Sequence, residues 1–135
     1  MTRDLNILLA HMQPELNPGR YAFVTLPFGM ELDSSSVVAS VQETEGLSVI
    51  IPEQIALELD LSVAFTAAWI TLTVHSDLAA VGLTAAFSQG LANSGISCNV
   101  VAGVHHDHLF VPVEQAQEAM DVLHALQSST AQQVV

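Results

Sequence analysis

Four adjacent side chains could bind a metal ion or transfer protons: His105, His106, Asp107 and His108. Imidazole nitrogens and carboxylate oxygens are common ligands of zinc, and a histidine beside an aspartate titrates near neutral pH. His75 closes a strand pattern that, in an antiparallel sheet, lies beside the strand beginning at His108. His75, Asp107 and His108 are therefore candidates for a metal site or for the acid–base pair of a small enzyme. The competing interpretation is a polar hairpin turn with solvent-exposed histidines.

Other reaction chemistry has little support in the sequence. The chain has no G-x-S-x-G motif, no glycine-rich phosphate loop and no H-E-x-x-H motif. Cys98 alternates with Val100 and is expected to face the core, where a thiol is not activated. We therefore expect no catalytic residue, no cofactor and no enzyme activity.

The composition disfavours two classes of partner. The 135 residues include 14 acidic side chains and only two basic ones, which gives a formal net charge of −12. Nucleic acids and anionic membrane surfaces are bound by basic patches, so we expect neither as a partner. The single cysteine and the lack of a signal-peptide pattern lead us to expect a cytoplasmic protein.

The spacing of apolar residues predicts alternating helices and strands. In the first half we expect a helix at 2–12, a strand at 21–26, a short helix at 33–45, a strand at 47–51 and a helix at 52–59. Residues 62–67 fit either a loop or an edge strand. In the second half we expect a strand at 69–75, a helix at 79–94, strands at 97–103 and 109–112 around a turn at 105–107, and a helix at 114–126 with a frayed polar tail.

Strand alternation divides the second half into two faces. Ile70, Leu72 and Val74 should face the helices, because right-handed crossovers place both helices on one side of the sheet. The opposite face is too mixed for a core and too apolar for a plain solvent surface: Thr71, Thr73, His75, Asn99, Val101, His108 and Phe110.

An internal repeat organises the chain. The segment LSVIIPEQIALEL at 47–59 is similar to HLFVPVEQAQEAM at 108–120, since each is a strand, a proline and a Glu-Gln pair that opens a helix. We expect an α+β protein of two degenerate ferredoxin-like (βαββαβ) units, 1–66 and 67–135, that share an antiparallel sheet. The first unit shows no obvious counterpart of strand 97–103, so we expect it to be shortened. The final strand missing from the second unit could come from the first half or from a partner subunit.

The second half resembles the ACT-domain family. The resemblance rests on Ser76-Asp77 at the end of a strand, on 81–84 at the start of a helix, and on 92–97 before the next strand. Residues 14–126 also resemble a bacterial group of tandem ACT-like proteins, which share the phrases GLTAAF, GISCNVVAG and HDHLFVP.

The resemblance implies an amino-acid site between the first strand–helix turn and a facing strand of a neighbouring domain. The matching ligand-binding positions are His75, Ser76, Asp77, Val81, Gly82, Leu83 and, on the facing strand, Asn99. Free N–H groups at the helix start could hold a carboxylate, and Asp77 could bind an ammonium group. Alternatively, Asp77 only caps the helix and Gly82 only permits close packing.

These observations predict a regulatory protein that binds a small molecule, has no catalytic domain and forms a homodimer. Two alternatives remain open. One is a metal-binding protein or small enzyme that uses His75, Asp107 and His108, and the other is a structural interaction module without a ligand.

Overall fold

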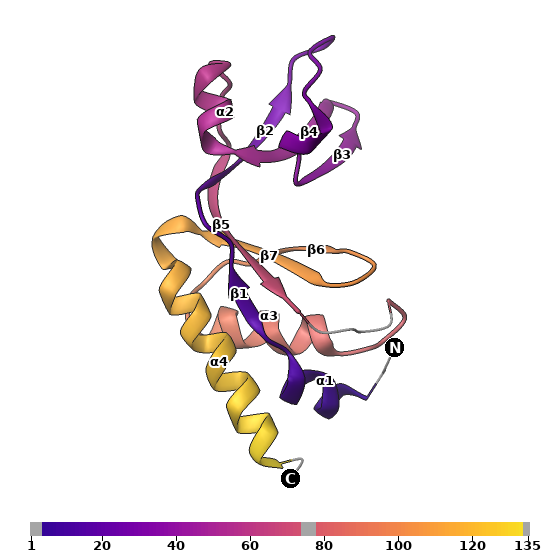
Figure 1. Ribbon diagram of the computed structural model, residues 1–135, viewed down its shortest axis with the longest axis vertical. Coiled ribbons are helices and arrows are strands. Elements are labelled where there is room, and N and C mark those ends of the chain that lie inside the picture. The colour runs from indigo at the N-terminus through magenta and orange to yellow at the C-terminus, as the bar shows by residue number, and fades with distance from the viewer. Residues whose placement is uncertain (1–3, 74–77, 134–135) are drawn as a thin grey trace.

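The computed structural model describes residues 4–73 and 78–133. Figure 1 shows the elements in chain order: helix α1 (Leu5–His11), strands β1 (Pro14–Leu16) and β2 (Tyr21–Leu26), the 3-10 turn η1 (Ser34–Ser36), strands β3 (Ala39–Glu43) and β4 (Gly46–Pro52), helix α2 (Glu53–Glu58), strand β5 (Phe65–Leu72), helix α3 (Leu83–Asn93), strands β6 (Asn99–Ala102) and β7 (Asp107–Pro112), the 3-10 turn η2 (Val113–Gln115) and helix α4 (Ala116–Gln133).

One antiparallel sheet runs through the molecule in the order β3-β4-β2-β5-β7-β6. β5 lies at its centre and pairs with β7 along residues 67–72. On its other edge, β5 pairs with β2 at residues 65–67 and with β1 at residues 70–72. The predicted boundary between residues 66 and 67 therefore falls inside a strand that both halves use. The α+β fold with a shared antiparallel sheet is confirmed.

β1 fills the position that the second half lacks. In a βαββαβ unit the last strand lies beside the first, and here β1 lies beside β5. The chain between β1 and β2 stays attached to β5, because Asn17 donates a backbone hydrogen bond of 2.9 Å to the Trp69 carbonyl. The Asn17 side chain donates a further bond of 2.9 Å to Thr71 Oγ1. The first half, rather than a partner subunit, thus supplies the missing edge.

The predicted helix at 33–45 is wrong. Asp33 caps only the three-residue turn η1, after which β3 pairs with β4 from Ala39 to Glu43. The valines of this segment have a spacing that fits a helix, but β-branched residues favour a paired strand when a partner is available. β3 pairs with β4 as β6 pairs with β7, so the first unit does have a counterpart of strand 97–103. The shortened part is the connection at 27–38, which contains η1 where the second unit has α3.

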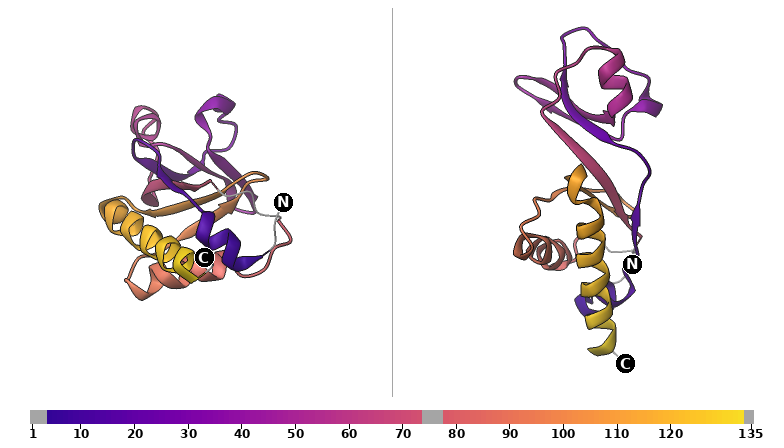
Figure 2. Two further views of the ribbon diagram at one scale, coloured as in Figure 1. Left: turned by 60° about the horizontal axis from the view of Figure 1, so that its bottom comes forward. Right: turned by 90° about the vertical axis from the view of Figure 1, so that its left-hand side faces the viewer.

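Side chains on the helix-bearing face form the main core. In β5, Ala68, Ile70 and Leu72 are buried against α1, α3 and α4, which Figures 1 and 2 show around the lower half of the molecule. A smaller cluster lies beneath α2 at the upper end, around Ala22 and Ile51. The alternation predicted for this strand is confirmed through Leu72, where β5 ends. The predicted positions of Val74 and His75 lie outside the described residues.

The opposite face carries an aromatic cluster and, among the described residues, no helix. Phe110 is fully buried there, and Trp69 and Phe23 pack against it with ring centroids 6.2 and 5.5 Å away. Ile50 and Ala67 complete its buried part. This cluster explains why the sequence of this face is too apolar for an ordinary solvent surface.

Helix α4 is longer than predicted, since it continues through Gln133. Gln127, which we expected in a frayed tail, donates a side-chain hydrogen bond of 2.6 Å to the carbonyl of Ala10 in α1. Thr130 is 6% exposed and donates to the Leu126 carbonyl. Contacts with α1 therefore stabilise the C-terminal turns. None of the helices in the described ranges is long and apolar enough to cross a membrane.

The substitution Gln127→Ala is expected to lower the free energy of unfolding by about 1–2 kcal/mol, because it leaves the buried Ala10 carbonyl without its partner. The control is Gln117→Ala, which removes an exposed bond to Asp121 in the same helix and should cost less than about 0.5 kcal/mol. Urea unfolding measures both. Equal effects of the two substitutions would contradict the role given to Gln127.

Candidate functional site

Helix α3 begins at Leu83, after Gly82 in a left-handed conformation with φ of 106°. A Cβ atom at Gly82 would lie 3.1 Å from Leu5 Cδ2. Both the backbone conformation and the packing of α1 therefore favour glycine at this position. The helix starts later than predicted, because a turn at 78–79 and an irregular segment at 80–82 precede it. Gly82 thus permits close packing, and it also leaves the start of the helix without a capping side chain.

A small cavity of about 120 Å³ opens at this helix start. Its walls come from the turn, the first residues of α3, the end of β6 and the start of β7: Leu78, Ala80, Gly82, Leu83, Thr84, Ala102 and Asp107. The first helical bond joins Ala86 N–H to the Gly82 carbonyl. The N–H groups of the residues from Leu83 to Ala85 therefore have no acceptor within the helix, and they carry the positive end of its dipole.

Asp107 contributes the charge in this cavity. It is 7% exposed and lies on the helix-bearing face, two residues before the buried Leu109. Burial raises the pKa of its carboxyl group, and the electrostatic influence of the neighbouring His108 and His106 opposes that rise. A largely desolvated carboxylate thus lines the same cavity as the helix N-terminus.

His108 lies on the opposite face of the sheet from Asp107. Trp69 Nε1 donates a hydrogen bond of 3.1 Å to His108 Nδ1, and Thr71 Oγ1 lies 3.3 Å from the same nitrogen. Burial lowers the pKa of His108, as does the charge of His106, while Asp107 raises it. Since Nδ1 accepts the bond from Trp69, the bonded imidazole is neutral.

The candidate metal ligands are not brought together within the described part of the chain. Asp107 and His108 point to opposite faces, and His75 lies outside the described residues. Nowhere in residues 4–73 and 78–133 do three or more His, Cys, Asp or Glu side chains form a group that could hold a metal ion.

The structure brings some of the expected ligand-binding residues to this cavity and places Asn99 on the other face of the sheet. Gly82 and Leu83 line the small cavity, although the Leu83 side chain is 4% exposed and packs into the core. Val81 is 85% exposed beside them. Asn99 is elsewhere, opposite Phe110 on the helix-free face. Three further predicted residues lie outside the described part: His75, Ser76 and Asp77.

Asp107 is the residue that sequence reasoning assigned to the wrong environment. The pattern at 105–108 suggested a turn, and Asp107 was expected to act beside His108. β7 instead begins at Asp107, and alternation with Leu109 and Val111 directs its carboxylate toward α3. That alternation was the available signal.

Cys98 packs against the main core, as predicted. Burial raises the pKa of its thiol to about 11. The thiolate, which is the nucleophilic form, is therefore scarce at neutral pH.

Comparisons with known proteins agree with the two-unit architecture. A family model described as ACT domain matches residues 2–68, and a second model with the same description matches residues 65–125. No curated protein sequence matches the chain.

Three solved structures illustrate the likeness. A protein of unknown function from Vibrio cholerae, described as a possible transport protein, is 41% identical over 91% of this chain and 95% of its own, with a TM-score of 0.78. The ligand-free regulatory subunit of aspartate kinase from Thermus thermophilus is 11% identical over 87% and 97%, with a TM-score of 0.62. Aspartokinase III of E. coli, in complex with aspartate and ADP, is 16% identical over 84% and 32%, with a TM-score of 0.58. At these low identities the two kinase structures show the fold alone.

The emission of Trp69, the single tryptophan, should change as the pH falls from about 8 to 5, because protonated His108 no longer accepts the indole hydrogen bond. The pKa of His108 is lowered from 6.5, so the midpoint should lie below 6.5. The unfolded chain binds this proton first, and stability should fall through the same pH window.

The variant His108→Gln, which keeps an acceptor but does not titrate, should abolish this transition. His105→Gln, at an exposed position, should retain it. A fluorescence transition that persists in His108→Gln would show that a group other than His108 causes it.

Proposed function

Because this chain belongs to the ACT-domain family and carries two ACT units in tandem, we propose that it is a regulatory protein that binds an amino acid and has no catalytic domain of its own. One observation carries the proposal: the free N–H groups of α3 and the buried carboxylate of Asp107 line a single cavity. A zwitterion has the complementary charges.

Each end of an amino acid has a partner in this cavity. The α-carboxylate would accept hydrogen bonds from N–H groups between Leu83 and Ala85, where the helix dipole also favours an anion. The α-ammonium group would bind the Asp107 carboxylate, whose raised pKa reflects a lack of solvent rather than a bound cation. A volume of about 120 Å³ suits the head of an amino acid better than a whole drug-sized ligand, which occupies about 300–1,000 Å³.

The ligand side chain would extend past the exposed Leu78 and Val81 at the edge of the cavity. His75, Ser76 and Asp77 remain proposed members of the site, since they precede the turn in sequence. The aspartokinase III structure contains aspartate, and this relative supports amino acids as the ligand class.

A homodimer remains part of the proposal, with Asn99 reaching the site from a facing strand of the second subunit. β6 is an end strand with a free edge, and its four residues carry no charge that would oppose pairing. Sedimentation equilibrium should give twice the chain mass of 14.3 kDa. A mass of 14.3 kDa at every concentration tested would contradict the dimer.

The single cysteine supports a reducing location such as the cytoplasm. The division into units at 1–66 and 67–135 also stays a proposal, with β5 common to both. The metal-binding alternative would need ligands beyond Asp107 and His108, which face apart.

Isothermal titration with a panel of free amino acids tests the site. We expect at least one amino acid to bind. The substitution Asp107→Asn should raise its dissociation constant by roughly 10- to 100-fold, which corresponds to the loss of one or more hydrogen bonds to a charged group. Asp121→Asn, an exposed substitution on α4, should leave the affinity unchanged.

The same variant has a predicted effect without ligand. The pKa of Asp107 is raised in the folded state. The folded protein therefore becomes less stable as the pH rises through that pKa, and ionised Asp107 destabilises the unliganded protein at neutral pH. Unliganded Asp107→Asn should therefore melt at a higher temperature than wild type at pH 7. Binding that is unchanged in Asp107→Asn, or no binding by any amino acid, would refute the proposed site.

A further inference from the structure

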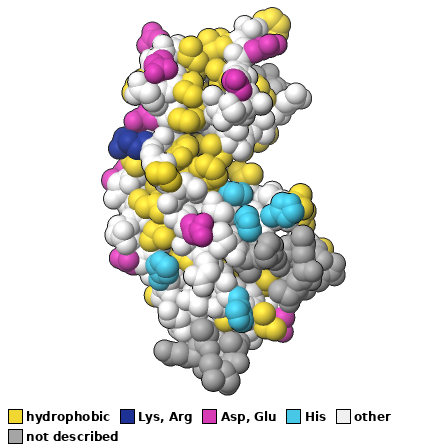
Figure 3. Space-filling model, in the orientation of Figure 1, with side chains coloured by type: hydrophobic (Ala, Val, Ile, Leu, Met, Phe, Trp, Pro, Cys, Tyr) yellow, Lys and Arg dark blue, Asp and Glu magenta, His cyan; other side chains and the backbone are white. Residues whose placement is uncertain are grey.

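A second cavity of the described residues lies on the helix-free face, away from the proposed amino-acid site. Its volume is about 500 Å³, within the usual range for small-molecule sites. β3 and β6 are the two end strands of the sheet, yet both line this cavity together with β2 and β4. The sheet therefore curves around it. Figure 3 shows a hollow on the right, between the upper lobe with β3 and β4 and the lower part with β6.

The inner wall of the cavity is apolar and well packed. Phe23 and Ile50 line it, and Phe23 is held by edge-to-face contacts with Phe65 and Phe110 at 5.5 Å. Ile50 is 6% exposed and Phe110 is fully buried. Such a wall offers a preformed apolar surface, and burial of a ligand against it is favourable by about 25 cal/mol per Å².

The outer end of the cavity is polar and acidic. In the β3–β4 hairpin, Ser48 lies opposite Val41 and also opposite Thr25 of β2. Glu43 follows two residues after Val41 on the same face, and its carboxylate accepts a hydrogen bond from Ser48 Oγ. A carboxylate can accept several hydrogen bonds, so Glu43 retains capacity for a donor from a ligand.

The charges around the cavity favour a cation over an anion. Among the described residues that line the cavity, Glu43 alone is ionisable. Arg20, the arginine within the described residues, forms an ion pair with Glu53 at 2.9 Å. It does not line the cavity. The formal net charge of −12 opposes an anionic ligand.

We propose that this cavity is a second binding site, for a small amphipathic amine. The apolar body of the amine lies against Phe23 and Ile50, and its ammonium group binds Glu43. Val101 and Asn99 of β6 form the facing wall. The site is separate from the proposed amino-acid site, because Val101 and Asn99 face the side of the sheet opposite to Asp107.

The test compares ligands that differ only in charge. Phenethylamine and n-hexylamine are titrated calorimetrically into the full chain, with 3-phenylpropionate and hexanoate as the matched anions. The amines should bind with a dissociation constant below about 1 mM, and the carboxylates should not bind measurably.

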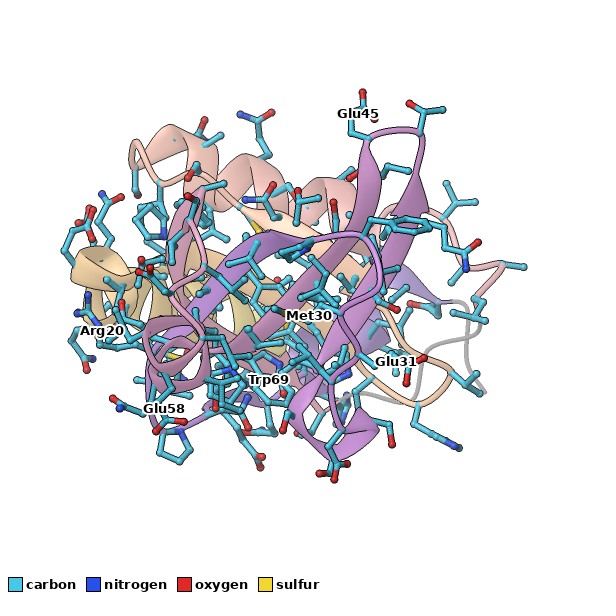
Figure 4. All side chains as sticks on the ribbon, turned by 90° about the horizontal axis from the view of Figure 1, so that it is seen from above. Arg20, Met30, Glu31, Glu45, Glu58 and Trp69 are labelled. Atoms are coloured by element: carbon cyan, nitrogen blue, oxygen red, sulfur yellow. The ribbon has the colours of Figure 1, made fainter. Side chains whose placement is uncertain are left out.

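Two pairs of variants locate the binding. Glu43→Gln should weaken amine binding by roughly tenfold, as expected for one charge-assisted hydrogen bond. Glu45→Gln should not weaken it, because Glu45 lies at the hairpin tip, directed away from the body in Figure 4, and does not line the cavity. Val101→Trp should block the cavity, whereas Val104→Trp, exposed in the next turn, should not.

Asp107→Asn should leave amine binding intact, so failure at one site is distinguishable from failure at the other. The proposal is overturned if neither amine binds, if carboxylates bind equally well, or if Val101→Trp leaves the affinity unchanged. A change of mass in Val101→Trp, with amine binding unaltered, would instead identify this face as a contact between copies of the chain and would likewise overturn it.

Discussion

Strand β5 is hydrogen-bonded along both edges, and the rest of the structure depends on that pairing. β7 occupies one edge, and β2 and β1 share the other. The strand therefore serves as the last strand of the first unit and the first strand of the second. Its fully buried Ile70 and Leu72 each contribute about 1.5–3 kcal/mol of burial free energy to the main core, whereas the cluster around Ala22 and Ile51 is separate. A chain of this length thereby builds two ACT units with a common strand.

The same sheet separates two chemical environments. Neighbouring residues of a strand face opposite sides, so Asp107 meets the start of α3 while His108 meets Trp69. The helix-bearing side supplies the charges that a zwitterion needs. The helix-free side supplies an aromatic wall with an acidic rim, because the sheet curves until its end strands share a cavity. The two proposed sites therefore lie on opposite faces of one sheet and differ in the side chains that line them.

Local patterns predicted the elements that depend on local spacing, and they failed where distant pairing decides. The strand at 47–51, its following helix and the alternation after Trp69 were correct. The valine spacing predicts a helix where β3 forms, because the pairing with β4 leaves no trace in that spacing. The sequence predicts a frayed tail at Gln127, because its hydrogen-bond partner Ala10 lies 117 residues away and local spacing cannot reveal it. Gly82 and Leu83, predicted to bind a ligand, line the cavity at the start of α3, and their ligand role stays a prediction. The sequence places Asp107 in a turn beside His108, whereas β7 begins at Asp107 and directs its carboxylate toward α3.

The central claim is that an amino acid binds where α3 begins. The most direct measurement is a titration of the ¹⁵N-labelled chain with individual amino acids, followed by two-dimensional NMR of the backbone amides. The account predicts that the largest shifts occur at the amides of Leu83, Thr84 and Ala85, which lack acceptors within the helix. Shifts largest at Asn99 and Val101, or no shift at α3 with any amino acid, would contradict it.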